Sequence, residues 1–133
     1  MKESEVVAAI IENNNEVLCM ERGQGKFEYV SFKYEFPGGK IEAGEEAAQA
    51  LQRELNEEMD LDIDAQNMTF FYTVNHEYPD FKIKLHTFIC RVKTRKFTMK
   101  EHVNFKWLPK NQLKTLEWAE ADWPIVEELA KGC

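Results

Sequence analysis

The hydrophobic positions of the chain follow a strand-like pattern in some stretches and a helical period in others. Residues 5–12 (EVVAAIIE) form a continuous β-branched and apolar run, which is typical of a central strand. The three asparagines at 13–15 predict a turn, so residues 17–20 should return as a second strand. Three further strand-like runs are residues 68–77, 81–93 and 105–108. The first two predict a hairpin joined at Tyr78-Pro79-Asp80.

Two stretches instead show the helical period. Residues 45–59 place Ala47, Leu51 and Leu55 four positions apart, which predicts an apolar stripe on one helix face. Residues 123–131 predict a last helix, with inward-facing residues at Ile125, Val126 and Leu129. A short helical turn is expected within residues 109–116. Strands before, between and after two helices favour an α/β fold in which a mixed sheet packs between helices.

One segment between the early strands is expected to be a long loop. Residues 23–33 contain two glycines and the aromatic residues Phe27, Tyr29 and Phe32, and such a loop could cover a pocket. The turn Pro37-Gly38-Gly39 follows it and precedes the first helix.

Composition and charge narrow the class of protein. The 133 residues are expected to form one domain, residues 1–133, with 44% apolar and 31% charged residues. The formal net charge of −7 argues against binding a nucleic-acid polymer. No apolar run reaches membrane-spanning length, and the N-terminus lacks a signal-peptide pattern. The sequence leaves the oligomeric state open. Cys19 and Cys90 lie in strand-like runs and are expected to be buried thiols. With Cys133 they form neither a metal-like spacing nor an even set for disulfides, so a reducing cytoplasm is expected.

The first helix carries the candidate chemistry. Glu54, Glu57 and Glu58 stand at i, i+3 and i+4 and therefore share one helix face. Like charges at this spacing repel, whereas Mg²⁺ binds carboxylate oxygens and completes its shell with waters and substrate phosphates. A solvated acidic face on a surface helix is the alternative.

A longer pattern favours the metal site. Gly39, five residues, Glu45, seven residues and then Arg53-Glu54-Leu55-Asn56-Glu57-Glu58 resemble the Nudix box, a motif that spans more than twenty positions. The resemblance extends along nearly the whole chain to the MutT-like and CTP pyrophosphohydrolase-like branch of Nudix hydrolases. It implies an α/β/α sandwich around a mixed sheet. The sequence departs from the motif at Asp60, where the family usually has glycine just past the helix end. Asp tolerates a left-handed backbone better than most residues, so the departure should leave the chemistry intact.

The resemblance assigns a set of residues to metal binding and catalysis. Gly38 corresponds to the turn glycine whose carbonyl binds a metal ion. Glu54, Glu57 and Glu58 correspond to the carboxylates that hold Mg²⁺, with Mn²⁺ as an alternative ion, and that position water. Glu101 corresponds to an additional carboxylate from a late loop, although its sequence context alone is that of a surface residue. Glu54 and Glu101 are both candidates for the general base.

A second set is expected to contact substrate or to support the site. Arg53 corresponds to the box arginine that orients the glutamates, and we expect it to act through Glu45. Arg22 corresponds to a nucleotide contact, and Lys40 is a candidate phosphate contact whose alternative is a solvated side chain. Tyr78 corresponds to an aromatic residue near the base, with packing in the hairpin turn as its alternative.

Asp122 takes the place of an asparagine that reads the purine in MutT, but it is also a good candidate for a helix N-cap. As an ionised carboxylate it would only accept hydrogen bonds. That would favour cytosine or guanine edges over uracil and thymine. His76, His86 and His102 are given no catalytic role.

The resemblance implies hydrolysis of a nucleoside triphosphate to the monophosphate and pyrophosphate. The expected substrates are 8-oxo-dGTP or cytidine nucleotides. The expected partner is therefore a small-molecule nucleotide. An alternative keeps the box but changes the substrate to ADP-ribose or a dinucleoside polyphosphate. A non-hydrolytic Nudix-like recognition domain is disfavoured, because such domains generally lack the full carboxylate set that is present here.

Overall fold

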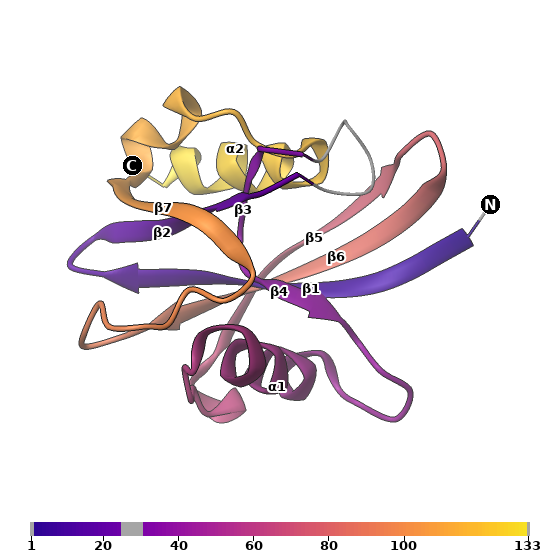
Figure 1. Ribbon diagram of the computed structural model, residues 1–133, viewed down its shortest axis with the longest axis horizontal. Coiled ribbons are helices and arrows are strands. Elements are labelled where there is room, and N and C mark those ends of the chain that lie inside the picture. Colours follow the sequence, from indigo (N-terminus) through magenta and orange to yellow (C-terminus); the bar gives the residue numbers. More distant parts are fainter. Residues whose placement is uncertain (1, 25–30, 133) are drawn as a thin grey trace.

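The computed structural model describes residues 2–24 and 31–132, and it places a mixed β-sheet between two α-helices (Figure 1). The α-helices are α1 (Ala47–Met59) and α2 (Trp123–Lys131). The strands are β1 (Lys2–Asn13), β2 (Glu16–Arg22), β3 (Tyr34–Glu35), β4 (Gly38–Lys40), β5 (Thr69–Glu77), β6 (Phe81–Arg91) and β7 (His102–Pro109). Short 3-10 helices are η2 (Ala65–Asn67), η3 (Lys110–Thr115) and η4 (Glu120–Asp122).

β1 is the central strand of this sheet. It runs parallel to β6 along its length, from Lys2 opposite Phe81 to Glu12 opposite Arg91. On its other edge it changes partner, because Val6–Ala8 pair with β4 whereas Glu12 and Asn13 pair with β2. β5 continues the sheet beyond β6, and β2 pairs with both β3 and β7. The short segment β3–β4 therefore lies between the diverging strands β1 and β2, which is where the site described below is built.

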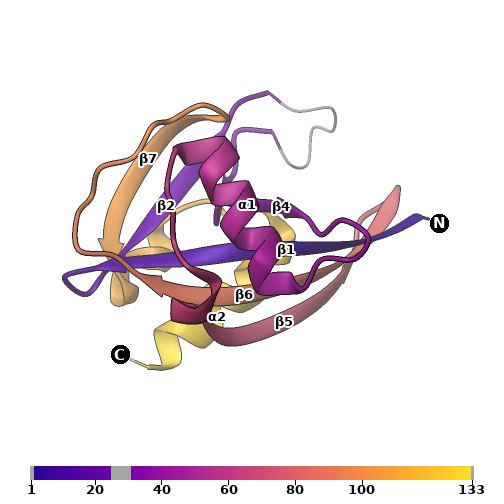
Figure 2. The same cartoon turned by 90° about the horizontal axis from the view of Figure 1, so that it is seen from below.

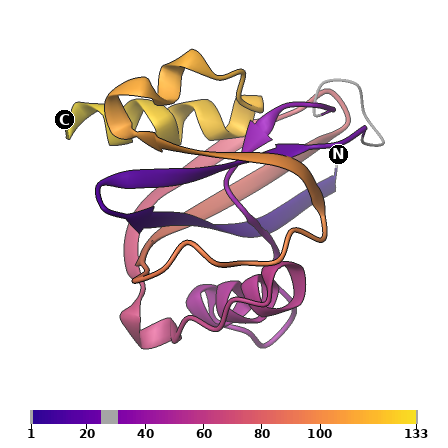
Figure 3. The same ribbon diagram turned by 60° about the vertical axis from the view of Figure 1, so that its left-hand side comes forward.

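The two faces of the sheet form separate hydrophobic cores. Successive side chains of a strand point to opposite faces, so Val7, Ala9 and Ile11 face α1 whereas Ala8 and Ile10 face α2. Figure 2 shows α1 crossing β1 and β4 on one side of the sheet, and Figure 3 shows α2 on the other. This double coverage explains the continuous apolar run of residues 5–12.

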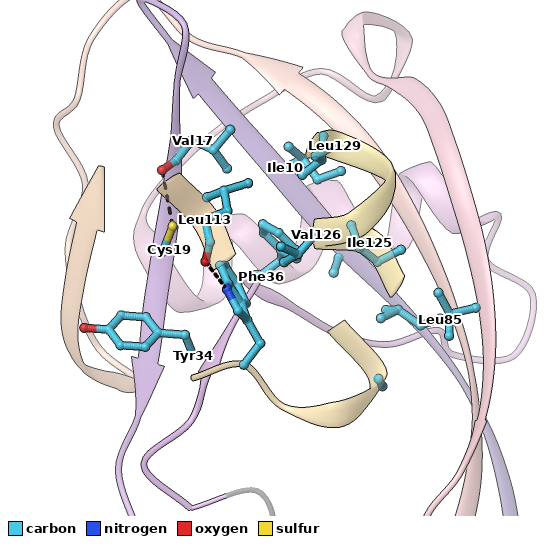
Figure 4. Close-up of a cluster of buried hydrophobic side chains, with 14 of the residues drawn as sticks. Ile10, Val17, Cys19, Tyr34, Phe36, Leu85, Leu113, Ile125, Val126 and Leu129 are labelled. Carbon is cyan, nitrogen blue, oxygen red and sulfur yellow. Dashed lines mark hydrogen bonds between the residues drawn. The ribbon is translucent and has the colours of Figure 1, made fainter. Parts of the chain in front are cut away.

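The α2 core is closed by aromatic residues. Trp118 is 1% exposed, stacks on Phe36 with ring centroids 4.7 Å apart, and donates its indole N–H to the Leu113 carbonyl at 2.7 Å. Figure 4 shows Phe36, Leu113, Ile125, Val126 and Leu129 converging in this core. The inward face expected for the last helix is thereby confirmed.

The α1 core also agrees with the apolar stripe expected from the sequence. Leu51 and Leu55 are fully buried, and Ala47 packs against the same cluster with partial exposure. α1 ends at Met59 and is followed by its C-cap Asp60, which has φ 53° and ψ 32° and whose N–H donates to the Asn56 carbonyl at 3.2 Å. The left-handed backbone expected at Asp60 is thus confirmed.

Some local details differ from the sequence-based predictions. Gly38 and Gly39 lie in strand β4 and not only in a turn, and β7 begins at His102 instead of residue 105. Phe27 and Tyr29, expected in the covering loop, lie outside the described residues, as does Cys133. Cys19 and Cys90 are buried free thiols, as expected, and burial raises the pKa of each to about 12. In the described part of the chain, no helix has the length and apolar character needed to cross a membrane.

Candidate active site

Arg53 organises the acidic face of α1. Its Nε and Nη2 atoms donate to both carboxylate oxygens of Glu45 at 2.8 and 3.0 Å, a bidentate pair. Its Nη1 atom donates to Glu54 at 3.0 Å and to Glu57 at 3.3 Å, and Nη2 also reaches the Lys40 carbonyl at 3.1 Å. The sequence-based expectation that Arg53 orients the glutamates through Glu45 agrees with this geometry. The shared hydrogen bonds lower the pKa of Glu45 and raise that of the Arg53 guanidinium.

Two glycines allow β4 to approach its neighbours closely. A Cβ atom on Gly38 would collide with the Val7 carbonyl of β1, and one on Gly39 would collide with the carboxylate of Glu54. The motif therefore needs glycine here for close packing between β1, β4 and α1. This contact brings the Gly38–Gly39 backbone against the acidic helix face.

Glu58 is a carboxylate in an unfavourable environment, because it is partly buried near other carboxylates. Its Oε2 atom is buried and has no hydrogen-bond partner among the described residues. Burial, followed by the charges of Glu54, Glu35 and Glu101, raises the pKa of Glu58 to about 8. Glu101, on the loop before β7, is thus one of the charges that act on Glu58.

These features fit a hard divalent cation. In residues 2–24 and 31–132, no three Asp, Glu, His or Cys side chains are gathered closely enough to enclose an ion as they stand. Mg²⁺ does not require such a cage, because it usually binds one or two carboxylates, waters and substrate phosphates. The orphaned Glu58 oxygen and the mutually repelling carboxylates around it are therefore suited to a cation that arrives with a polyphosphate.

A cavity of about 200 Å³ lies between the glycine strand β4 and the C-terminal segment. Its walls include Arg22, Gly38, Tyr78 and Asp122, four of the residues that the sequence singled out. Ligand pockets are typically about 300–1,000 Å³ for drug-sized molecules, so this cavity suits one part of a nucleotide. Glu54, Glu57, Glu58 and Glu101 are not among its lining residues. Lys40 is exposed and lines a neighbouring surface hollow with Lys2 and Asp80.

Asp122 lies in the wall of this cavity and is only 6% exposed. It occupies the N-cap position of α2, but its side chain makes no capping hydrogen bond, so the capping alternative is wrong. Its Oδ1 atom instead accepts from the Phe36 backbone N–H at 3.3 Å.

The surroundings of Asp122 act against the ionised state expected from the sequence. Burial and the nearby Glu35 carboxylate raise its pKa well above the usual value, against a smaller opposing effect of the Phe36 N–H and Arg22. The shift favours the protonated form, in which the carboxyl has one O–H donor as well as an acceptor oxygen.

Tyr78 contributes to the same wall from the turn between β5 and β6. It is 3% exposed, and its hydroxyl oxygen accepts from the Ala121 N–H at 3.1 Å. Its ring lies 5.0 Å from that of Phe81 and 4.5 Å from that of His76, centroid to centroid. Tyr78 thus packs the hairpin turn, as its alternative interpretation expected, and links it to the segment that carries Asp122.

Sequence reasoning missed Glu35 and gave His102 no role. The Glu35 carboxylate hydrogen-bonds His102 Nε2 at 2.9 Å and pairs with Arg22 at 3.5 Å. His102 is buried and immediately follows Glu101, whereas Glu35 lines the cavity. Glu35 therefore connects the cavity wall to the strand that begins after Glu101. The local signal was a carboxylate directly before the Phe-Pro-Gly-Gly turn.

The mixed sheet between two helices, with an arginine-ordered acidic helix against a glycine strand, defines the class of this protein. The chain matches the NUDIX domain family over residues 1–129 and belongs to that family. It is a Nudix hydrolase of the MutT-like branch.

Two relatives from Escherichia coli (strain K12) support this placement. The 8-oxo-dGTP diphosphatase is 32% identical over 132 residues, which are 98% of this chain and 99% of the relative. The CTP pyrophosphohydrolase is 31% identical over 129 residues, which are 96% of this chain and 91% of the relative. Among solved structures, the Escherichia coli ORF135 protein matches with a TM-score of 0.83 and 29% identity, over 98% of this chain and 91% of that one. The fold expected from the sequence is confirmed.

Proposed function

We propose that this protein hydrolyses a nucleoside triphosphate to the nucleoside monophosphate and pyrophosphate, with 8-oxo-dGTP or a cytidine nucleotide as the preferred substrate. The observation that carries the proposal is the acidic face of α1 beside a cavity with a buried Asp122 in its wall. The relatives that act on 8-oxo-dGTP and CTP, each covering more than nine-tenths of this chain, support the same substrate classes.

The proposed cofactor is Mg²⁺, with Mn²⁺ as a replacement. Glu54, Glu57, Glu58 and Glu101, together with the Gly38 carbonyl, are the proposed ligands. When bound, the ion would neutralise the polyphosphate and lower the pKa of a coordinated water. Arg53 keeps Glu54 and Glu57 in one orientation while Glu58 presents its unpartnered oxygen.

The reaction adds water across a phosphoanhydride bond. The resemblance implies attack at the β-phosphorus, so that the water oxygen appears in pyrophosphate and the nucleoside monophosphate leaves. One carboxylate accepts the proton of the attacking water. Glu54 is fixed by Arg53 at 3.0 Å, whereas Glu101 is exposed on a loop, and these two are the candidates for the base. Arg22, Tyr78 and Asp122 are proposed to hold the nucleoside in the cavity, and Lys40 to contact phosphate from the neighbouring surface hollow.

Protonation of Asp122 would change which bases fit the site. A neutral carboxyl offers one donor and one acceptor, as an asparagine amide does. This suits oxidised guanine, which presents a carbonyl oxygen at C6 and a hydrogen at N7. The expected rejection of uracil and thymine requires an ionised Asp122.

A nucleotide panel tests the proposal. Release of pyrophosphate is measured with Mg²⁺ for 8-oxo-dGTP, dGTP, CTP, dCTP and UTP, and release of phosphate-containing products for ADP-ribose. Hydrolysis of 8-oxo-dGTP or a cytidine nucleotide well above UTP supports it, and exclusive hydrolysis of ADP-ribose contradicts it. Asp122→Asn, which keeps a donor and an acceptor, should preserve the base ranking. Asp122→Leu, which has neither, should flatten it. An unchanged ranking in Asp122→Leu would exclude base reading by Asp122.

A further inference from the structure

Asp60 does more than satisfy the backbone at the end of α1. Its left-handed φ of 53° is a conformation that glycine adopts freely, which accounts for the glycine usual at this motif position. Glycine, however, has no side chain. The Asp60 carboxylate accepts a hydrogen bond from Lys100 Nζ at 2.8 Å, forty residues later in the chain.

One further contact joins the same segments. The Thr98 N–H donates to the Met59 carbonyl at 2.9 Å. We call Asp60, Thr98 and Lys100 the α1 latch. It fastens the loop between β6 and β7 to the C-terminal end of the helix that carries Glu54, Glu57 and Glu58.

The residue directly after the α1 latch is Glu101, the proposed fourth carboxylate of the site. On the other side of Glu101, the buried His102 is held by Glu35 at 2.9 Å. Glu101 itself is exposed, and its charge acts on Glu58 in the same direction as those of Glu54 and Glu35. Like charges push the loop away from the helix, so a contact near Glu101 is needed to hold it there.

We propose that Asp60 is a positioning residue, which holds the Glu101 loop against the acidic helix face through Lys100, next to the Thr98–Met59 backbone bond. This inference rests on the proposed function, because it concerns the placement of one of its carboxylates. It assigns a role to the side chain at a position where the motif usually has none. Asp60 touches neither substrate nor reacting atoms and acts only through Glu101.

Asp60→Gly is a clean perturbation, because glycine suits the backbone at this position while it removes the carboxylate. Asp60 and Lys100 side chains are 52% and 43% exposed, and exposed ion pairs are weak. The expected loss in kcat is therefore about two- to tenfold, with KM changed less than about twofold. Lys100→Met should show a similar loss, and Lys100→Arg should restore most of it. Lys131→Met, which breaks the Lys131–Glu128 pair on α2, is the matched control and should have no effect.

The dependence on Glu101 is tested in a Glu101→Gln background. Asp60→Gly should cause no further loss there if it acts by positioning Glu101. A loss of equal size in both backgrounds, or an unchanged kcat in Asp60→Gly with Glu101 present, would overturn the proposal.

Hydrogen exchange gives a readout that does not depend on activity. The Thr98 amide should exchange several times faster in Asp60→Gly and Lys100→Met than in wild type or Lys131→Met, with melting temperatures unchanged. Equal exchange in all four proteins would overturn the α1 latch even if hydrolysis is confirmed. Faster exchange in a protein that hydrolyses no nucleotide would keep the latch and contradict the proposed function instead.

Discussion

The buried Asp122 should make the stability of this protein fall as pH rises, and Asp122→Asn should remove that dependence. Asp122 is 6% exposed, and its carboxylate is paired with a backbone N–H and not with a cation at short distance. The charged groups that act on it are Glu35 of β3 and, more weakly, Arg22 of β2. Tyr78 lines the same cavity, but its pKa is raised to about 12, so it stays neutral over the range considered.

The sign follows from the direction of the shift. The unfolded chain has the ordinary pKa of 3.8, and the folded value lies well above it. Between these two values the native state binds more protons than the unfolded state, so stability falls as pH rises. The contribution of Asp122 is fully present below pH 3.8 and is lost as pH rises through the folded value. The slope cannot exceed about 1.4 kcal/mol per pH unit for one group.

The assay is urea unfolding of wild type and Asp122→Asn at intervals from pH 4.5 to 9. Because asparagine does not titrate and the other groups are common to both proteins, the difference in unfolding free energy isolates Asp122. We expect this difference to move in favour of Asp122→Asn by up to about 1.4 kcal/mol per pH unit, then to level off above the folded pKa.

Two controls separate charge from hydrogen bonding. Asp122→Ala leaves the Phe36 N–H without its acceptor, which should cost about 1–3 kcal/mol at every pH, in addition to the lost packing. Glu35→Gln removes the neighbouring negative charge and should shift the levelling-off point to lower pH. A difference between wild type and Asp122→Asn that is flat from pH 4.5 to 9 would refute the reasoning that burial keeps Asp122 neutral.

Three further predictions concern the helix and the thiols. Glu57→Gln should abolish most turnover and weaken Mg²⁺ binding while the melting temperature stays within a few degrees, and near-normal activity at saturating Mg²⁺ would exclude Glu57 from the metal site. Arg53→Lys cannot reproduce the bidentate pair with Glu45, so it should lower both kcat and the free energy of unfolding, the latter by about 1–3 kcal/mol in calorimetry or urea titration. Cys19 and Cys90, both fully buried with pKa values raised to about 12, should resist thiol reagents at pH 8 until urea unfolds the protein, and rapid labelling of the native state would contradict their burial.

The elements with strong periodicity could be predicted from the sequence because local pattern and tertiary burial agree there. α2 has the predicted bounds, residues 123–131, since Pro124 suits the first turn of a helix and the apolar residues repeat on one face. α1 begins at Ala47 and not at Glu45, because Glu45 is drawn out of the helix to accept from Arg53 and from the Glu42 N–H at 2.9 Å. In this case a side-chain pair decides the boundary.

The glycine strand shows what sequence patterns do not contain. Gly38 and Gly39 predict a turn because glycine is common in turns, yet both residues lie in β4. They are needed because the Val7 carbonyl and the Glu54 carboxylate approach from other elements. The resemblance identified Gly38 as important, but only the packing of β1 and α1 against β4 explains why a side chain is not tolerated there.

The cavity wall shows the same limit for charged residues. Asp122 precedes a helix, and this local context favours a capping role, but the carboxyl turns instead to Phe36, 86 residues earlier in the chain. Glu35 and His102 are 67 residues apart, and neither has a local partner that would reveal the pair. Arg22 and Tyr78 join the same wall from β2 and the β5–β6 turn. The divergence of β1 and β2, which lets the segment that carries Glu35 and Phe36 enter between them, brings these residues together. That divergence follows from the pairing of the strands, so the chemistry of the cavity could be described only from the sheet topology. The acidic helix face, by contrast, could be recognised from the spacing of its glutamates in the sequence.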